Sequence, residues 1–420
     1  MEKGDSRKFF IYIVIVLIFV EILDTYSTLM LTVVPSKIIE EFLSSGPQNV
    51  ADSIFQIAVA FGTIGTYLVF FNQYMADKIG RKTLLVITVF GMGLASLLIS
   101  ISTNIILYAL FLFFLYIFFG SDIWVIYINE ETEPGRRAFW TNFILVGGVI
   151  GALLVPTFRS IFITETSSNW RGMTYFAILL AIPLGIIILF TFKETSKYAE
   201  IQATESLSID QNTVLKEKMR SIFNSSHKKE FISILVISFM VGLNYLFVNI
   251  GESFLANGSN LTDTEINIVV YAISFSVVLG YLITGYVADK FGRRVLLYLY
   301  SILMPISIFI VIIGTSVESG ALFIISLGAS LANICYWGLG VLVRIVTLEI
   351  TPTNARGTGT GLKSLLGAFG VTSGLLISSL ITILFNLGLS FIIFSLLLLV
   401  NVPLTHYFLK ETKDTDLGLI

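Results

Sequence analysis

The sequence predicts an all-α membrane protein in which twelve transmembrane helices form two six-helix bundles related by pseudo-twofold symmetry. Three observations predict this fold class: the composition, the number of long apolar runs and an internal repeat. Of the 420 residues, 55% are apolar and only 13% are charged, whereas soluble domains carry about 25% charged residues. The mean hydropathy is +0.88. A chain with so little charge cannot cover a water-exposed surface, so a soluble protein is excluded.

Apolar runs of about 20 residues, the length that crosses the hydrocarbon core of a bilayer as an α-helix, occur throughout the chain. The runs are apolar on every side, which excludes the alternating pattern of membrane barrel strands. We expect twelve spans near 9–34, 53–76, 83–102, 104–129, 139–158, 172–192, 230–253, 265–288, 295–316, 321–348, 358–383 and 386–409.

The distribution of lysine and arginine predicts the orientation, because these residues accumulate in cytoplasmic loops. With both termini inside, the inner segments hold 21 of the 26 basic residues and the outer loops hold 3. We therefore expect a multi-pass protein of the cell (plasma) membrane with both termini in the cytoplasm.

An internal repeat divides the chain into two halves. Residues 75–82 (MADKIGRK) recur as 287–294 (VADKFGRR), and residues 192–195 (FKET) recur as 409–412 (LKET). Residues 131–134 (ETEP) have a counterpart in 349–352 (EITP). We expect an N-terminal bundle at 1–192, a cytoplasmic loop at 193–229 and a C-terminal bundle at 230–420. Two such halves are typical of transporters whose substrate site lies near mid-membrane.

The D-K-x-G-R-K/R loops after spans two and eight resemble the signature of the major facilitator superfamily. Within it, the chain resembles the sugar-porter and general substrate-transporter branch. The residues that carry this second resemblance are Glu349, 352–353, 356–357, 194–198, 411–413 and 242–244. The resemblance covers the whole chain and implies a cavity lined by spans one, four, seven and ten. The sugar-binding set of that branch is incomplete, because no paired glutamines precede residues 242–244 and no Gly-Pro precedes Trp337.

The loop charges are candidates for a cytoplasmic gate. Glycine permits a backbone with positive φ in the tight turn, and arginine binds carboxylates with two parallel hydrogen bonds. By resemblance, the network holds the two halves together on the inner side. Alternatively, the arginines only enforce topology and meet lipid phosphates. The candidate gate residues are Asp77, Gly80, Arg81, Glu131, Arg137, Asp289, Gly292, Arg293, Glu349 and Arg356.

Ionisable residues inside spans are costly at mid-bilayer and therefore indicate function. Asp24 and Glu21, three residues apart on span one, are the candidate proton carriers, although either could cap a buried polar network. Asp122 lies on span four and Arg344 on span ten, two spans that are equivalent in the repeat, and we expect the two side chains to face each other at similar depth. They either pair with each other or leave Arg344 to bind an anionic part of the substrate.

Polar and aromatic residues of spans four, seven and ten are candidate pocket residues: Asn244, Tyr245, Asn249, Trp124, Tyr336 and Trp337. Packing against lipid or neighbouring helices is the alternative for each of them. Glu252, at the outer end of span seven, is expected to be exposed to water.

The sequence thus predicts a secondary transporter, a proton symporter for a small polar organic solute. A sugar is the first candidate, an organic acid the second and export of an amphipathic compound the third; a non-transporting sensor on the same fold is the candidate from another class. The histidine and cysteine content, 2 and 1 residues, disfavours a metal site. We expect no enzymatic activity, no cofactor, no nucleic acid partner and a monomer in the lipid bilayer.

Overall fold

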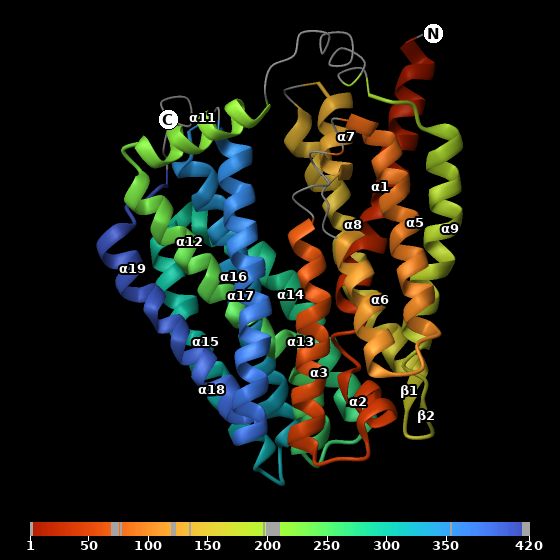
Figure 1. Cartoon of the computed structure of the whole chain (residues 1–420), viewed down its shortest axis with the longest axis vertical. Helices are drawn as coiled ribbons and strands as arrows, with labels where there is room; N and C mark the ends of the chain where they lie inside the picture. Colours follow the sequence, from red (N-terminus) through yellow and green to blue (C-terminus); the bar gives the residue numbers. More distant parts are fainter. Residues whose placement is uncertain are drawn as a thin grey trace. The chain divides into compact units, whose positions relative to one another are not determined.

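The computed structural model describes residues 3–68, 75, 78–118, 123–133, 136–195, 198, 211–352 and 355–413. Within this part of the chain, twelve helices are long and apolar enough to cross a membrane, which confirms the predicted number. The chain divides into two compact units (Figure 1). Unit 1 consists of Met1–Val34 and Phe61–Ser208, and unit 2 of Pro35–Ala60 and Ile209–Ile420.

Unit 1 contains the first long helix and the spans that follow the second. Its elements are α1 (Lys3–Leu29), η1 (Ile64–Leu68), α5 (Arg81–Ser100), α6 (Ile105–Phe118), α7 (Ile123–Glu131), α8 (Arg137–Phe162) and α9 (Gly172–Thr191). A short hairpin of β1 (Ile163–Thr164) and β2 (Ser167–Ser168) connects α8 to α9. Large apolar side chains such as Phe190 (79% exposed) and Ile106 (77% exposed) point outward from these helices, as expected of a lipid-facing surface.

Unit 2 contains the second half of the chain and, in addition, a segment from between the first two spans. Its elements are α2 (Pro35–Leu43), α3 (Gln48–Thr63, shared with unit 1 after Ala60), α11 (Gln211–Asn224), α12 (Lys228–Leu243), α13 (Tyr245–Gly258), α14 (Asp263–Phe291), α15 (Arg293–Thr315), α16 (Ala321–Ile350), α17 (Arg356–Leu384), α18 (Leu387–Leu397), η4 (Leu398–Val400) and α19 (Asn401–Phe408).

The boundaries of the first two spans differ from the prediction. Helix α1 ends at Leu29 rather than near residue 34, and a separate short helix, α2, begins at Pro35. Proline suits the first position of a helix because it fixes φ and lacks the N–H that would have no partner there. Helix α3 then begins at Gln48, about five residues earlier than predicted, because polar side chains of its first turns make hydrogen bonds to other helices of unit 2.

Equivalent helices pack in the same way in both units. Helix α1 packs on α8, and α12 packs on α17. In unit 1, a Cβ added to Gly151 would lie 2.7 Å from the carbonyl oxygen of Ile22; in unit 2, one added to Gly374 would lie 2.7 Å from that of Leu243. Glycine is therefore what lets the helix backbones approach so closely. The two halves of the sequence repeat therefore form the same close helix pair, α1 with α8 in unit 1 and α12 with α17 in unit 2.

Span seven is interrupted at Asn244, which separates α12 from α13. The Asn244 amide donates to the carbonyl of Met240 (3.1 Å) in its own helix and to the carbonyl of Phe394 (2.9 Å) in α18. Interrupted helices expose main-chain polar groups inside a membrane and are found where they line a site or a cavity.

Candidate functional site

The turn before α5 is the first candidate site, and it lies within unit 1. Gly80 has φ 97° and ψ 152°, a conformation that suits glycine alone. The carboxylate of Glu194, beyond the end of α9, accepts a hydrogen bond from the backbone N–H of Lys82 in the first turn of α5. Helix N-termini leave unpaired N–H donors and carry partial positive charge. Glu194 therefore caps α5 from a segment more than 100 residues away.

Arg81 connects this turn to the end of α7. Its side chain is buried, its Nη2 lies 3.2 Å from Glu130 Oε1, and its Nε donates to the same oxygen at 3.2 Å. Thr195 Oγ1 donates to the other oxygen of Glu130 at 2.5 Å. The guanidinium also lies 5.3 Å from the ring centroid of Tyr198. The helix starting at Arg81, the end of α7 and the segment after α9 are thus joined by one charged cluster.

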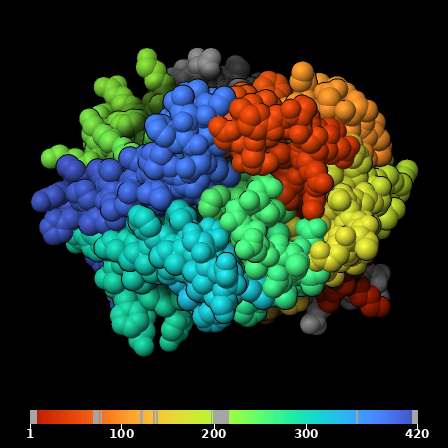
Figure 2. Space-filling model, turned by 90° about the horizontal axis from the view of Figure 1, so that it is seen from below, coloured from red at the N-terminus to blue at the C-terminus, as the bar shows by residue number. Residues whose placement is uncertain are grey.

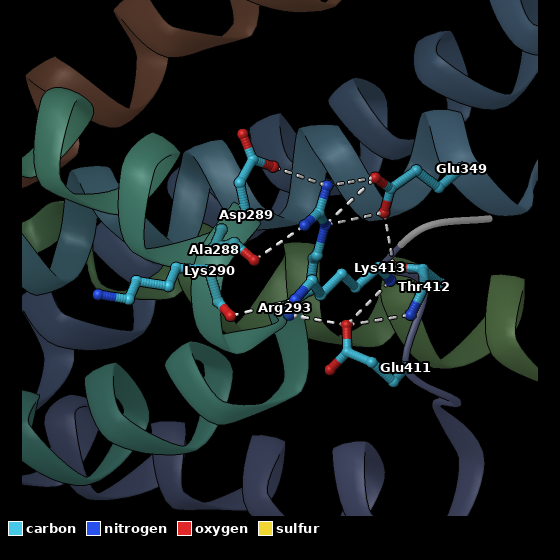
Figure 3. Close-up of polar contacts among 8 residues, drawn as sticks. All are labelled: Ala288, Asp289, Lys290, Arg293, Glu349, Glu411, Thr412 and Lys413. Atoms are coloured by element: carbon cyan, nitrogen blue, oxygen red, sulfur yellow. Dashed lines mark hydrogen bonds and ion pairs between the residues drawn. The ribbon is translucent and has the colours of Figure 1, made fainter.

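Unit 2 repeats this arrangement at the turn before α15 (Figure 3). Gly292 has φ 96° and ψ 160°. Glu411, after α19, accepts hydrogen bonds from the backbone N–H groups of Arg293 (2.8 Å) and Arg294 (3.1 Å). Glu411 therefore caps α15 as Glu194 caps α5.

Arg293 takes the place of Arg81 in this second cluster. Its Nη2 lies 2.8 Å from Glu349 Oε1, at the end of α16, and 3.0 Å from Asp289 Oδ1. Thr412 Oγ1 donates to Glu349 Oε2 at 2.5 Å, and Arg293 Nη1 donates to the carbonyl of Ala288 at 2.8 Å. Figure 3 shows the guanidinium between the two carboxylates of Asp289 and Glu349. We refer to the two arrangements as the turn clusters of units 1 and 2.

The pKa values of the two capping carboxylates are shifted in opposite directions. Burial raises the pKa of Glu194, and the opposing N–H groups of Lys82 and Thr83 do not compensate for it. Burial also raises the pKa of Glu411, but four backbone N–H donors, led by those of Arg293 and Arg294, outweigh it, so the pKa is lowered overall. The deprotonated carboxylate is therefore favoured more strongly in unit 2 than in unit 1.

The structure brings together only part of the predicted gate set. Gly80 with Arg81, and Gly292 with Asp289, Arg293 and Glu349, each lie in a turn cluster. In the turn cluster of unit 1, Arg81 forms an ion pair with Glu130, the residue before the predicted Glu131, which is exposed. Glu130 was not predicted, and the role of Glu131 in the gate stays a prediction.

Other members of the predicted gate set are described only in part. Asp77 and the side chain of Arg137 lie outside the described residues. Arg356 begins α17 and is half-buried. The capping roles of Glu194 and Glu411 and the hydroxyl groups of Thr195 and Thr412 were not predicted, although the repeated K-E-T tripeptide was a signal for them.

The carboxylates of span one lie on α1 in unit 1. Glu21 is buried at 8% exposure, whereas Asp24 is half-buried. Thr25 Oγ1 donates to Glu21 Oε1 at 3.4 Å. A Cβ added to Gly148 of α8 would lie 2.8 Å from that same oxygen. Glu21 therefore faces α8, while Asp24, almost one turn further on, lies at a more accessible position.

The pocket candidates of spans seven and ten form an aromatic cluster in unit 2. The ring of Tyr336 lies 5.8 Å from that of Tyr245 and 5.3 Å from that of Trp337, and Tyr281 lies 5.9 Å from Trp337, all between ring centroids. This tyrosine–tryptophan cluster spans α13, α14 and α16 and begins at the interruption of span seven.

Among the buried donors of unit 2 that have no hydrogen-bond partner in the described part of the chain, two belong to the predicted pocket residues. Among the described residues, neither Asn249 Nδ2 nor Trp337 Nε1 has a hydrogen-bond acceptor. Leaving a buried donor unsatisfied costs about 1–3 kcal/mol. Asn249 lies one turn after Tyr245 on α13. Both donors are thus available to an acceptor that the protein itself does not provide.

The remaining pocket candidates are placed as follows. Arg344 is exposed on α16, two helical turns after Trp337. Its predicted partner Asp122 lies outside the described residues. Trp124 is buried at 4% exposure in α7 of unit 1. Asn244 uses its amide hydrogens within unit 2, as described above.

Glu252 is not exposed to water, contrary to the expectation from its place at the end of span seven. It is 6% exposed, and its carboxylate accepts hydrogen bonds from the backbone N–H (2.9 Å) and the hydroxyl (2.8 Å) of Ser36. The sequence could not reveal this contact, because the partner is 216 residues away in a helix that was not predicted.

Comparison with known proteins identifies the family. A family model described as the major facilitator superfamily matches residues 14–250 and 231–418. The sialic acid transporter NanX of Escherichia coli (strain K12) is 27% identical over 359 residues, covering 78% of each chain. The arabinose-proton symporter of Bacillus subtilis (strain 168) is 23% identical over 390 residues, covering 82% of this chain and 81% of that protein.

A solved structure shows the same fold. The crystal structure of a D-xylose-proton symporter superimposes with a TM-score of 0.76 at 16% sequence identity, covering 96% of this chain and 99% of that chain. At this identity the likeness concerns the fold alone. The relatives are transporters and not enzymes. Twelve membrane-spanning helices, repeated turn clusters and a family match over nearly the whole chain lead to one conclusion: the protein is a transporter that belongs to the major facilitator superfamily.

Proposed function

We propose that the protein is a proton-coupled symporter that takes up a small polar organic solute, with a sugar as the first candidate, by alternating access of a central cavity to the two sides of the membrane. Two of its relatives support this class of function, since their names describe the transport of sialic acid and of arabinose with protons. Both termini would lie in the cytoplasm of a cell whose plasma membrane holds the protein, as the excess of basic residues in the inner segments indicates.

The observation that carries the proposal is that two buried donors have no partner in the described part of the chain: Trp337 Nε1, within the tyrosine–tryptophan cluster, and Asn249 Nδ2, one turn after Tyr245 on α13. Binding sites for small molecules combine apolar and aromatic walls with a few polar groups that fix orientation. A hydroxylated solute offers acceptor oxygens to both donors and an apolar ring face to the aromatic side chains. Binding would then satisfy groups that are otherwise costly to bury.

A carboxylated solute is the second candidate, and a specific residue favours it. Arg344 lies seven residues after Trp337 on α16, hence on the same face of the helix. A guanidinium binds a carboxylate with two parallel hydrogen bonds. Sialic acid, the cargo named for one relative, is both a sugar and an acid and would use all three groups.

Uptake into proteoliposomes tests the proposed function. Labelled arabinose, xylose, sialic acid and benzoate are supplied with and without an imposed pH gradient, acid on the outside. We expect gradient-dependent accumulation of at least one of these solutes. Equal uptake of every solute into protein-free liposomes would contradict the proposal. Uptake of benzoate alone would favour the acid over the sugar.

Two substitutions test the site itself. Trp337→Phe removes the indole donor but keeps an aromatic ring, and Asn249→Ala removes the amide. Each is expected to raise KM about tenfold, which corresponds to about 1.4 kcal/mol and to the loss of one hydrogen bond. Trp140→Phe is the matched control, since Trp140 packs among Phe10, Phe139 and Phe143 of unit 1. An unchanged KM in both site variants would show that the substrate does not bind at the tyrosine–tryptophan cluster.

A further inference from the structure

Four polar side chains are completely buried where α3 meets α17 and α18 in unit 2. Gln56 of α3, Ser378 and Thr382 of α17 and Ser390 of α18 are each 0% exposed, and we call them the buried oxygen cluster. Residues 35–60 belong to unit 2, and the red-orange surface of this segment adjoins the blue surface of the C-terminal helices (Figure 2). Buried polar groups nearly always have hydrogen-bond partners, so the partners of these four decide what the cluster can bind.

The hydrogen bonds within the buried oxygen cluster use up its hydroxyl hydrogens. Gln56 Nε2 donates to Thr382 Oγ1 at 3.1 Å, and the hydroxyl oxygens of Thr382 and Ser390 lie 3.1 Å apart. Ser390 Oγ donates to the carbonyl of Ser378 at 3.4 Å. Because a hydroxyl has one hydrogen and two lone pairs, Thr382 must be the donor to Ser390. The cluster therefore has lone pairs to spare on its oxygens.

Two oxygens of the cluster have no partner. Among the described residues, neither Gln56 Oε1 nor Ser378 Oγ makes a hydrogen bond. The next hydroxyl on the same helix behaves differently, since Ser379 Oγ donates to the carbonyl of Leu376 within α17 at 2.7 Å. Burying an oxygen without a partner is unfavourable. Either a hydrogen-bond donor or a cation would relieve this at both atoms.

A buried carboxylate lies one helical turn before Gln56 on α3. Asp52 is 5% exposed. Its hydrogen bonds from Gln48 Nε2 and Ser253 Oγ, both 3.0 Å long, end on the same oxygen, Oδ1. Both donors are neutral, and within the described part of the chain no lysine or arginine forms an ion pair with Asp52. A buried carboxylate that lacks a counter-charge is costly, so this charge favours a cation over a water molecule beside it.

The groups present select the kind of cation. Carboxylate, amide and hydroxyl oxygens suit hard cations rather than the metals that prefer sulfur or imidazole. In the ranges that the structure describes, no three His, Cys, Asp or Glu side chains come together as a metal site. A divalent ion would keep a net positive charge beside the single carboxylate of Asp52, whereas a monovalent ion leaves the buried site neutral.

We propose that the buried oxygen cluster binds a monovalent alkali-metal cation, such as sodium, through Gln56 Oε1, Ser378 Oγ and the spare lone pairs of Thr382 and Ser390, with Asp52 balancing the charge. The ion satisfies both unpartnered oxygens and the carboxylate at once, and it joins α3 to α17 and α18. This inference goes beyond the proposed function, because proton-coupled uptake does not require a metal ion.

Binding of radioactive sodium to the purified protein in detergent tests the site. It needs no transported solute, so its failure is distinguishable from failure of the proposed function. We expect saturable binding of one ion per chain. Asp52→Asn, which removes the charge, and Gln56→Leu, which removes the amide oxygen, are each expected to weaken binding at least tenfold. Ser379→Ala is the matched control and should bind as the wild type does, because its hydroxyl is used within α17. No saturable binding to the wild type, or equal affinity in all variants, would refute the site.

Thermal unfolding provides a second measurement, in which each variant is compared with itself. A ligand that binds the folded state raises the melting temperature in a concentration-dependent way. Sodium chloride should therefore raise the melting temperature of the wild type above its value in choline chloride of equal ionic strength. This difference should be lost in Asp52→Asn and Gln56→Leu and kept in Glu318→Gln, which removes an exposed carboxylate of the same unit. Equal melting temperatures of the wild type in the two salts would indicate a buried water molecule and a protonated Asp52 instead, and would overturn the proposal.

Discussion

At the scale of single residues, Gly80 and Gly292 have backbone angles that exclude other residues. The two turns also bring a carboxylate against the missing side chain, because a Cβ on Gly292 would lie 2.5 Å from Glu411 Oε2. The glycine and its capping glutamate therefore depend on each other, and the same dependence occurs at Gly80 and Glu194.

Replacement of Gly292 should destabilise the fold. Gly292→Ala is expected to lower the free energy of unfolding by about 1–3 kcal/mol, the cost of placing a non-glycine residue in this region, with the steric conflict added. The measurement is the thermal unfolding of the purified protein in detergent. Gly285→Ala is the matched control, because nothing lies within 4 Å of its added Cβ. Equal melting temperatures of the two variants would contradict the assigned turn.

The pKa of Glu411 makes a pH-dependent prediction. Because this pKa is lowered in the folded protein from about 4.3 in an unfolded chain, the carboxylate stabilises the fold above that pH, and this stabilisation is lost as the pH falls through the folded pKa. The melting temperature of Glu411→Gln should therefore lie furthest below that of the wild type above about pH 4.3, and the difference should narrow as the pH falls through the folded pKa.

The equivalent residue of unit 1 should behave in the opposite way. The pKa of Glu194 is raised, so its contribution to stability is present below about 4.3 and is lost as the pH rises through the folded pKa. The amount by which the melting temperature of Glu194→Gln lies below that of the wild type should therefore be largest at low pH and should decrease as the pH rises. Parallel pH profiles of the two variants would contradict the different environments of the two carboxylates; Glu318→Gln controls for the loss of a charge alone.

At the scale of elements, each turn cluster joins the start of one helix, the end of another and the segment after the last helix of its half. The joints are charged, and they lie within one unit each. That these residues also hold the two halves together on the inner side stays a prediction. The contacts described above support a role in holding the helix ends of each unit as a rigid group, which alternating access by rocking halves would require.

Substitution of two adjacent glutamates tests the turn cluster of unit 1. Glu130→Gln removes the charge facing the buried Arg81 and is expected to lower stability by about 2 kcal/mol, as for hydrogen bonds to charged groups, and to slow transport. Glu131→Gln is the matched control, one residue away and exposed. Thermal unfolding and initial uptake rates would be compared. A larger effect of Glu131→Gln than of Glu130→Gln would contradict the role assigned to Glu130.

The second unit offers an internal comparison. Glu349→Gln leaves Arg293 with Asp289 at 3.0 Å, so its cost is expected to be smaller than that of replacing Glu349 and Asp289 together. The same two measurements apply.

At the scale of the whole molecule, proton coupling requires an ionisable group that both sides of the membrane reach in turn. Asp24 is half-buried on α1, whereas Glu21 is buried against α8. Of the two predicted carriers, the accessibility of Asp24 suits the role better, and Glu21 suits a position in a packed polar contact.

Asp24→Asn is therefore expected to abolish accumulation against a gradient but to spare exchange of labelled for unlabelled solute across the membrane. The amide cannot carry a proton, yet it has nearly the same size and polarity. Asp24→Glu, which keeps an ionisable group, should retain part of the accumulation. The measurement is uptake into proteoliposomes with an imposed pH gradient. Full accumulation by Asp24→Asn would exclude this residue as the proton carrier.

The sequence by itself determined the number of membrane spans, the repeat of the two halves and the family. These features depend on local apolar length, which the thickness of a bilayer fixes, and on motifs that recur at a nearly constant offset. The glycine–arginine turns could also be predicted, because a tight turn before a helix requires a positive φ, which glycine permits.

Only the tertiary structure decided which side chains meet. It paired Glu130 with Arg81, buried Glu252 against Ser36, gave Glu194 and Glu411 their capping roles and attached α2 to the second half of the chain. Each of these depends on a rotation of about 100° per helical residue or on a contact between segments far apart in sequence. The length of an apolar run predicts neither the direction of a side chain nor its distant partner, because a helix face that contacts lipid and one that contacts protein are equally apolar.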